Sequence, residues 1–285
     1  MERITILGTG LIGASIGLAL RAHHFGGTIL GWDKDPAELG IALSRGAVDE
    51  AVEDPITAAA GGDLILLAGP VFSILDWTDQ LGPLLGAHQL VTDVGSVKGA
   101  VCERAVLSFG GAGQAEFLPG HPMAGKEVHG AKHADADLFQ GAVWLFTPLT
   151  DAGGSSGLQA EWREWVGKFG CKTLDFDPQR HDELCAWVSH LPQFVSTAMS
   201  ALLEDKFAGD EGLRAIGGRA LREMTRLGAS PYSMWRDVAH TNTAAIAETL
   251  LALEQRLMHV RENLKTPELR EEFELANRFR AGQKG

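Results

Sequence analysis

His121 is the residue whose type and setting best suit acid–base chemistry in this sequence. It stands between Gly120 and Pro122 in the run Gly-His-Pro-Met-Ala-Gly, which restrains its backbone. An imidazole titrates near neutral pH and can take a proton from a hydroxyl group. The chain holds 10 histidines, so a histidine without a catalytic role remains the alternative for His121 considered alone.

A second run, Thr-Asp-Val-Gly-Ser-Val-Lys at 92–98, contains two further candidates, Ser96 and Lys98. Both runs follow predicted strands, and open α/β sheets bind their ligands at the carboxyl ends of strands. We therefore expect His121, Ser96 and Lys98 to share one site, with Lys98 contributing to substrate binding.

The run Gly-Thr-Gly-Leu-Ile-Gly at 8–13 has the spacing of a dinucleotide-binding loop and lies between a predicted strand and a predicted helix. Gly8 permits a tight turn, Gly10 lets the backbone approach a pyrophosphate, and Gly13 lets the helix pack against the strand. The pyrophosphate would rest on the free N–H groups of the helix start, beside Leu11 and Ile12.

Asp33 ends the second predicted strand, about 20 positions beyond the glycine loop. A carboxylate there accepts hydrogen bonds from the adenosine ribose hydroxyls and repels a 2′-phosphate, which favours NAD over NADP. Lys34 follows and would soften that preference. Pro70, just after a predicted strand, is assigned to the same cofactor site. The alternative is that Asp33 is only a turn residue ahead of Asp35.

Arg219, Arg222 and Arg226 recur at spacings of three and four and so share one face of a predicted helix. Arginine binds carboxylates in a bidentate manner, so this stripe is a candidate site for a dianion in an otherwise acidic chain. The alternative is a solvated helix face with Glu223 nearby.

Pro192 lies inside a predicted helix, in the run Ser-His-Leu-Pro-Gln at 189–193. It removes one backbone hydrogen bond, leaves the Val188 carbonyl without its helical donor and bends the axis. That bend would direct His190 and Gln193 into a cleft and make both substrate-binding residues. A packed core position for His190 remains the competing interpretation.

Short apolar runs alternate with helical stretches over roughly the first 175 residues, which predicts a parallel sheet covered by helices on both faces. Helices are expected at 11–22, 36–45, 71–85 and 158–169, and a surface loop at Asp151–Gly157. The predicted strands are Arg3–Leu7, Thr28–Trp32, Asp63–Ala68, Gln89–Asp93, Glu116–Leu118, Ala142–Phe146 and Cys171–Phe176.

Beyond Asp177 the strand pattern ends and helix signals take over. Asp177-Pro178, Ser230-Pro231 and Thr266-Pro267 each pair a capping side chain with a proline that needs no N–H partner, and each predicts a helix start. The stretch 231–263 can form one long helix, whose apolar stripe would either pack in the core or form a dimer face. We therefore expect an α/β Rossmann-like dinucleotide-binding domain at 1–177 and an all-α domain at 178–285.

Composition narrows the classes of function. The 285 residues carry a formal charge of −12, which argues against nucleic acid and anionic membranes as partners. Three cysteines without metal-site spacing predict reduced thiols in a cytoplasmic protein and no bound metal. The apolar run at 4–20 is too short for a membrane span and is interrupted by glycines.

Taken together, these segments resemble the prephenate dehydrogenase family, which includes arogenate and cyclohexadienyl dehydrogenases. The similarity runs from residue 6 to about residue 237 in the family's order of segments. The matching pieces are Gly8–Gly13, Asp93–Lys98, Gly120–Gly125 with Glu127 and Gly130, Ser189–Pro192, Met224–Arg226 and Met234–Asp237.

The resemblance implies a homodimer formed through the helical domain, with the active site between the two domains. It implies NAD-dependent oxidative decarboxylation of prephenate to 4-hydroxyphenylpyruvate and CO2, in tyrosine biosynthesis, driven by the gain of aromaticity. By position, His121 would polarise or deprotonate the ring hydroxyl, and Ser96 would lie near that histidine and the nicotinamide. Arg226 would hold a substrate carboxylate, and Trp235 would lie near the substrate, in reach of either subunit.

Two departures from the family pattern leave the substrate open. Gln193 stands where many relatives have a second histidine, and Gly218–Leu221 replaces a glycine-rich, aromatic run. Arogenate dehydrogenase is therefore the alternative function. A β-hydroxyacid dehydrogenase would need a catalytic lysine in the helical half, in a setting that we do not find. A catalytically silent NAD-binding sensor is the alternative of a different class.

Overall fold

The computed structural model describes residues 1–126, 128–149 and 157–282. Glu127 and the surface loop predicted at Asp151–Gly157, apart from Gly157 itself, lie outside the described residues. Among the described helices, none is both long enough and apolar enough to cross a membrane.

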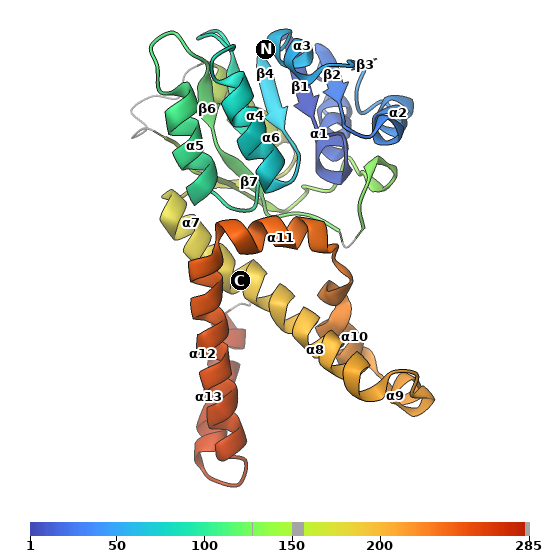
Figure 1. The fold of residues 1–285 in the computed structure, drawn as a ribbon, viewed down its shortest axis with the longest axis vertical. Coiled ribbons are helices and arrows are strands. Elements are labelled where there is room, and N and C mark those ends of the chain that lie inside the picture. Colours follow the sequence, from blue (N-terminus) through green and yellow to red (C-terminus); the bar gives the residue numbers. More distant parts are fainter. Residues whose placement is uncertain (127, 150–156, 283–285) are drawn as a thin grey trace.

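A six-stranded parallel sheet forms the centre of the N-terminal half (Figure 1). Its order, β3-β2-β1-β4-β5-β6, is that of a dinucleotide-binding Rossmann fold and reverses between β1 and β4, where such folds bind their ligand. Its strands are β1 (Arg3–Leu7), β2 (Thr28–Trp32), β3 (Glu50–Ala51), β4 (Leu64–Leu67), β5 (Leu90–Asp93) and β6 (Glu116–Leu118).

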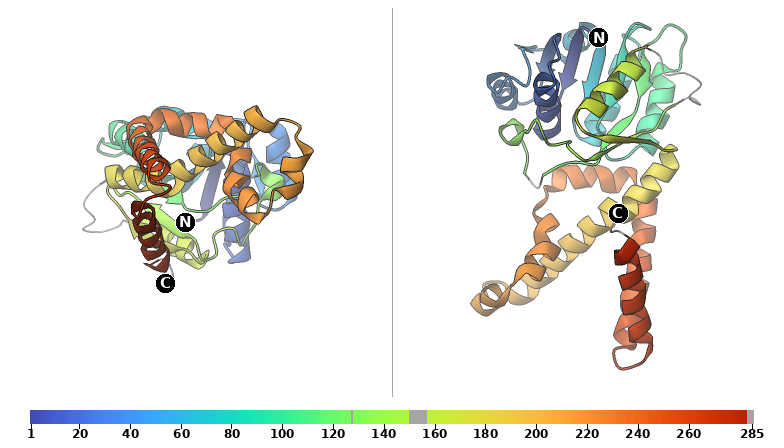
Figure 2. Two further views of the ribbon diagram at one scale, coloured as in Figure 1. Left: turned by 90° about the horizontal axis from the view of Figure 1, so that it is seen from below. Right: turned by 180° about the vertical axis from the view of Figure 1, so that it is seen from behind.

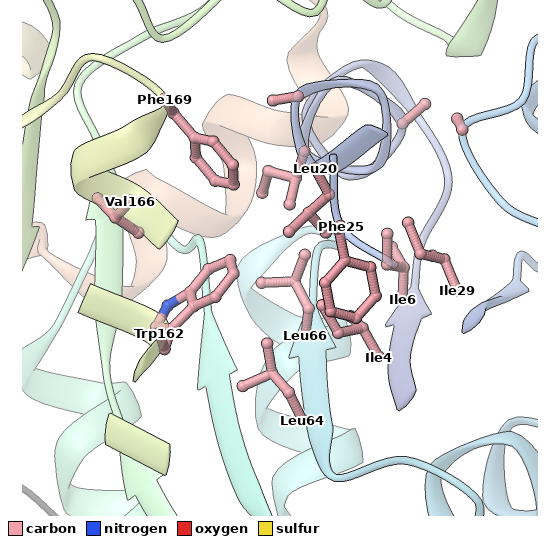
Figure 3. Close-up of a cluster of buried hydrophobic side chains, with 14 of the residues drawn as sticks. Ile4, Ile6, Leu20, Phe25, Ile29, Leu64, Leu66, Trp162, Val166 and Phe169 are labelled. Atoms are coloured by element: carbon pink, nitrogen blue, oxygen red, sulfur yellow. The ribbon is translucent and has the colours of Figure 1, made fainter. Parts of the chain in front are cut away.

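Helices cover both faces of this sheet. They are α1 (Leu11–Ala22), α2 (Pro36–Ser44), α3 (Pro55–Ala60), α4 (Val71–Leu81), α5 (Gly99–Phe109) and α6 (Gly157–Lys168). Because side chains of a strand alternate between faces, Leu64 and Leu66 of β4 pack in the cluster with α1 and α6 (Figure 3). Ile65 and Leu67 pack against α4 and α5 on the other face. The predicted doubly covered parallel sheet is confirmed.

A separate three-stranded sheet follows, and it differs from the prediction. It contains β7 (Gly120–Pro122), β8 (Val143–Phe146) and β9 (Lys172–Asp175), with β7 antiparallel to β8. His121 therefore lies in a short strand that was not predicted, and the last two predicted strands do not extend the main sheet. A three-residue strand of Gly, His and Pro has no period-2 pattern by which a sequence could reveal it.

The C-terminal half is helical throughout its described residues, and Figure 2 shows its long helices extending away from the sheets. Helix α13 lies along α12, with Arg256 bonded to Glu272 at 2.7 Å. The elements are α7 (Pro178–Cys185), a π-helical turn (Ala186–His190), α8 (Leu191–Phe207), α9 (Glu211–Ile216), α10 (Arg219–Thr225), a 3-10 turn (Arg226–Ala229), α11 (Tyr232–Thr241), α12 (Thr243–Glu262) and α13 (Glu268–Gly282).

The expected single helix over 231–263 is wrong, because the chain breaks at Asn242 between α11 and α12. The Asn242 amide donates to the Asp182 carbonyl oxygen at 3.0 Å, a tertiary contact that holds the break. Asp177 caps α7 as predicted. Ser230 does not cap α11, which begins at Tyr232 after Pro231.

Candidate active site

The glycine loop forms a cradle at the start of α1. Gly8 has φ +99°, and a Cβ there would lie 2.6 Å from the Ala68 carbonyl oxygen. A Cβ at Gly13 would lie 2.0 Å from the Gly8 carbonyl oxygen, so the helix approaches the strand too closely for any side chain. A Cβ added at Gly10 would point into open space, with no atom of another segment within 4 Å, and no side chain of the described residues caps α1. The open space and the free N–H groups of α1 fit a pyrophosphate.

Asp33 borders the same cradle at the end of β2. Its carboxylate accepts the Thr9 N–H at 2.7 Å and the Asp35 N–H at 2.9 Å, which fixes its orientation beside the loop. Pro70 precedes α4 after β4, on the other side of the point where the strand order reverses. These residues fit the two ends of a dinucleotide bound across β1 and β4.

Lys98 was predicted to bind substrate, and in the structure its ammonium is bonded to groups of the protein itself. Its side chain is fully buried, its ammonium is bonded to the Asp93 carboxylate, and it donates to the Gly120 carbonyl oxygen at 2.9 Å. Asp93 also accepts the Gly120 N–H at 3.1 Å. The Asp93–Lys98 pair therefore ties β5 to the strand that carries His121.

His121 is 7% exposed and lies at the carboxyl side of the main sheet, at the contact with α7. Burial, followed by the neighbouring His181, lowers the pKa of His121 well below its usual value, so the imidazole is neutral at pH 7. Ser96 is half-buried in the loop between β5 and α5, where its neighbour Val97 packs against Val238 of α11. This loop and β7 both face the helical half.

The sequence reasoning missed two residues of the site, His181 and Asp182 in α7. His121 Nδ1 lies 2.9 Å from His181 Nε2, and His181 Nδ1 lies 2.8 Å from Asp182 Oδ1. Burial lowers the pKa of His181 as well. In the sequence, these two residues appear only as an adjacent His-Asp pair one turn after a predicted helix start. That pair does not indicate a partner for His121 until the helix is known to pack against β7.

One group among the described residues could offer three metal ligands: His121, His181 and Cys185. The two imidazoles already bond to each other, and Cys185 Sγ lies 3.6 Å from His181 Nε2. Burial raises the pKa of the Cys185 thiol to about 12, so at neutral pH this side chain is a neutral thiol beside the two imidazoles. The two imidazoles belong to a hydrogen-bonded chain.

His190 ends a π-helical turn, two residues before Pro192 in the first turn of α8, so the helix is irregular where the proline was expected to distort it. The imidazole is fully buried, and burial lowers its pKa to about 4. Its Nδ1 lies 3.3 Å from the Asn242 amide, and its Nε2 has no partner among the described residues. Trp235 packs edge-on against it, with ring centres 5.9 Å apart. His190 is thus buried, yet it keeps an unsatisfied nitrogen.

A cavity of about 620 Å³ lies beside Trp235, between α8, α11 and the start of α4. Two predicted substrate-binding residues, Gln193 and Trp235, line it. Arg236 also lines it and was not predicted, while Phe72 and His240 form an edge-to-face pair on its wall. Its size suits a small-molecule ligand.

The three arginines predicted to share one helix face have different surroundings in the structure. Arg219 is bonded to Glu223 at 2.6 Å on an exposed helix surface, and Arg222 donates to the Gly217 carbonyl oxygen. Arg226 begins the 3-10 turn after α10 and is exposed. The solvated-face interpretation therefore describes Arg219, whereas Arg226 lies one turn from the cavity residue Gly228.

The structure thus has three features that bear on chemistry: a dinucleotide cradle, a neutral buried histidine in β7, and a cavity lined by Arg236 and aromatic side chains. A neutral imidazole can accept a proton, and the cradle holds a redox cofactor. Such a set suits oxidation of a hydroxyl-bearing carbon.

Comparisons with known proteins agree with this description. The family model for the nucleotide-binding domain of prephenate dehydrogenase matches residues 16–160, and the model for its dimerization domain matches residues 177–280. A prephenate dehydrogenase of Lactococcus lactis is 31% identical over 88% of this chain, which spans 68% of that relative.

Two solved structures share the whole fold. Prephenate dehydrogenase of Aquifex aeolicus, in complex with hydroxyphenyl propionate and NAD+, has a TM-score of 0.88 and 26% identity, over 99% of this chain and 98% of that one. Synechocystis arogenate dehydrogenase has a TM-score of 0.77 and 29% identity, over 98% and 99% of the two chains. Sequence models that cover both halves, together with these structures, show that the chain belongs to the prephenate dehydrogenase family.

Proposed function

We propose that this protein is an NAD-dependent prephenate dehydrogenase. The observation that carries the proposal is His121, a buried and neutral base where β7 meets α7, in a protein that also has a dinucleotide cradle and a cavity of about 620 Å³. Membership in the family supplies the substrate class, a hydroxycyclohexadiene that carries two carboxylates.

The reaction converts prephenate and NAD+ into 4-hydroxyphenylpyruvate, CO2 and NADH. NAD, when bound, supplies the acceptor for the hydride of the hydroxyl-bearing ring carbon. His121 takes the hydroxyl proton, and the C–C bond to the ring carboxylate breaks so that its electron pair completes the aromatic ring. His121 then returns the proton to the phenolate oxygen, so the enzyme ends in its starting state.

We assign the remaining site residues by their positions. Ser96 lies in the β5–α5 loop and would hydrogen-bond near the ring hydroxyl. Trp235 and Gln193 line the cavity and would contact the substrate, and His190 Nε2 is a buried donor without a described partner. Arg226 would bind a carboxylate. Lys98 acts indirectly by holding the Gly120 carbonyl group.

Arogenate is the second candidate substrate, and Gln193 favours it. The Gln193 amide nitrogen donates to Thr197 Oγ1 at 3.1 Å and to the Leu227 carbonyl oxygen at 2.7 Å. Both amide hydrogens are therefore used, and only Oε1 remains to meet a ligand. An acceptor suits the ammonium group of arogenate better than the keto group of prephenate.

We propose a homodimer formed through the helical half. The apolar stripe predicted over 231–263 is buried only near its start: Ile246 is 5% exposed, whereas Leu257 is 59% exposed. Further large apolar side chains of this half are more than a third exposed: Leu202, Ile216, Met224, Met234, Leu251, Met258, Leu264, Phe273, Leu275 and Phe279. A second copy would cover this surface.

We also propose the boundary at 177/178, because β9 ends at Asp175 and only helices follow among the described residues. A cytoplasmic location is proposed from the cysteines, since Cys102, Cys171 and Cys185 are all free thiols.

The test is a set of initial rates of NADH or NADPH formation with prephenate and with arogenate, each with NAD and NADP. We expect the rates with NAD to exceed those with NADP because of Asp33. Faster turnover of prephenate supports the main proposal, and faster turnover of arogenate supports the second. No turnover in any mixture, with NAD binding intact, would replace both proposals with the NAD-binding sensor.

A further inference from the structure

The catalytic histidine is the first member of a chain of three buried side chains. His121 Nδ1, His181 Nε2, His181 Nδ1 and Asp182 Oδ1 follow one another at 2.9 Å between the imidazoles and 2.8 Å from imidazole to carboxylate. His181 is 0% exposed and Asp182 is 8% exposed, so water does not compete for these bonds. The two ends come from different halves of the protein, β7 and α7.

The carboxylate end of this chain is fixed by the start of α5. Asp182 Oδ1 accepts the Lys98 N–H at 2.7 Å, and Oδ2 accepts the Gly99 N–H at 2.8 Å. No other side chain caps α5 among the described residues. Two backbone donors at a helix N-terminus stabilise a charged carboxylate, which can only accept hydrogen bonds.

The charged Asp182 carboxylate determines which ring nitrogen of each histidine carries a hydrogen. Since the Asp182 carboxylate accepts, His181 must carry its hydrogen on Nδ1. A neutral His181 then has a lone pair on Nε2, so the hydrogen between the two imidazoles belongs to His121 Nδ1. The lone pair of His121 is therefore on Nε2, the nitrogen that the chain of bonds leaves free.

We propose that His181 and Asp182 are positioning residues that hold His121 in the tautomer with a basic Nε2 and stabilise the imidazolium formed when Nε2 takes the substrate's hydroxyl proton. This inference rests on the proposed function. His181 and Asp182 act through His121, to which these hydrogen bonds join them. When His121 Nε2 returns its proton to the phenolate oxygen, the three side chains again have the hydrogens with which they started.

Other charged and titratable groups surround this chain. Lys98, paired with Asp93, lies close enough to lower the pKa of His121, and so does His190. Cys185 is a neutral thiol beside both imidazoles. Within the chain of hydrogen bonds, the Asp182 carboxylate carries the charge that balances a transient imidazolium.

The first test is ¹⁵N NMR of histidine-labelled protein without substrate, with the His121 signals assigned by their loss in His121→Gln. We expect Nδ1 of His121 to be protonated and Nε2 not. His181→Leu removes the acceptor, so His121 should shift toward the Nε2–H form. His181→Gln offers an amide oxygen in the place of Nε2 and should retain much of the original form.

The second test is kinetic. We expect His181→Leu to lower kcat about 100-fold with KM changed much less, and His181→Gln to recover about tenfold of that loss. Asp182→Asn should lower kcat about tenfold or more, because the balancing charge is gone. Asp177→Asn is the matched control, since it alters a capping carboxylate on the same helix α7 outside the chain of bonds and should leave kcat unchanged.

Two results would overturn the proposal: a His121 that carries its hydrogen on Nε2 in the unaltered protein, or a His181→Leu variant with unchanged His121 signals and kcat. NAD binding and the melting temperature of each variant show whether it is folded. Because the NMR measurement needs no substrate, it decides the tautomer even when neither prephenate nor arogenate is turned over, an outcome that would refute only the proposed function.

Discussion

Replacing Lys98 with methionine tests whether the Asp93–Lys98 pair holds the two sheets together at the site. Both side chains are 0% exposed, so the variant leaves the Asp93 carboxylate buried without its counter-charge. Breaking such a pair by removing one partner costs about 3–5 kcal/mol. Asp93 keeps the Gly95 N–H at 2.8 Å and the Gly120 N–H at 3.1 Å. We therefore expect the lower end, about 3 kcal/mol.

For a chain of this size, that loss corresponds to a fall in Tm of roughly 6–12 °C. Urea unfolding and calorimetry measure it, and kcat should fall too because the strand that carries His121 loses an anchor. Lys126→Met is the matched control: it breaks a lysine–aspartate pair with Asp135 at 2.9 Å whose partners are 37% and 46% exposed. We expect no measurable change in its Tm, because water screens that pair.

The double variant Lys98→Met with Asp93→Asn completes the experiment. It leaves no charge at positions 93 and 98, so part of the lost stability should return and the two substitutions should not be additive. A Tm of Lys98→Met equal to that of the unaltered protein, or a double variant less stable than either single one, would show that this ion pair does not support the site.

Two further predictions concern the cofactor loop and the buried histidine. Gly10→Ala should leave Tm unchanged, because nothing lies within 4 Å of its new Cβ, while weakening NAD binding; Gly13→Ala should lower both, because its Cβ would lie 2.0 Å from the Gly8 carbonyl oxygen. Titration calorimetry measures NAD binding by the two variants, and thermal melts measure their Tm. An equal Tm for Gly10→Ala and Gly13→Ala would contradict the packing argument. Burial lowers the pKa of His190 from 6.5 to about 4, so the unfolded chain binds a proton there that the folded chain excludes. Above pH 6.5 this difference in proton binding has no effect on the free energy of unfolding. As the pH drops to 4, proton uptake by the unfolded chain lowers that free energy by roughly 3 kcal/mol. Urea midpoints of His190→Gln should therefore depend less on pH than those of the unaltered protein, and parallel curves would contradict the buried, neutral state.

Local chemistry made most of the first half predictable from the sequence. The glycine spacing at 8–13, the apolar strands and the cap at Asp177 each depend on neighbours along the chain, and the structure has the loop, the strands and the cap where they were expected. His121 was selected as the candidate base because an imidazole titrates near neutral pH and because glycine and proline on either side restrain its backbone. Short-range patterns of this kind survive folding because few tertiary contacts compete with them.

The partners of those residues depended on the tertiary structure alone. Lys98 appeared to be a substrate ligand until the packing of β5 against β7 buried it beside Asp93. The break at Asn242 follows from a hydrogen bond to Asp182, a residue 60 positions earlier. His181 reaches His121 across the same 60-residue separation.

The sequence by itself therefore determined the cofactor loop and the class of fold, and it supplied His121 as the candidate base. The tertiary structure decided which buried groups bond to that base and which charges are removed from water. The physical reason is range: helix periods, caps and glycine turns act over a few residues, whereas burial and hydrogen-bond direction depend on segments that only folding brings into contact.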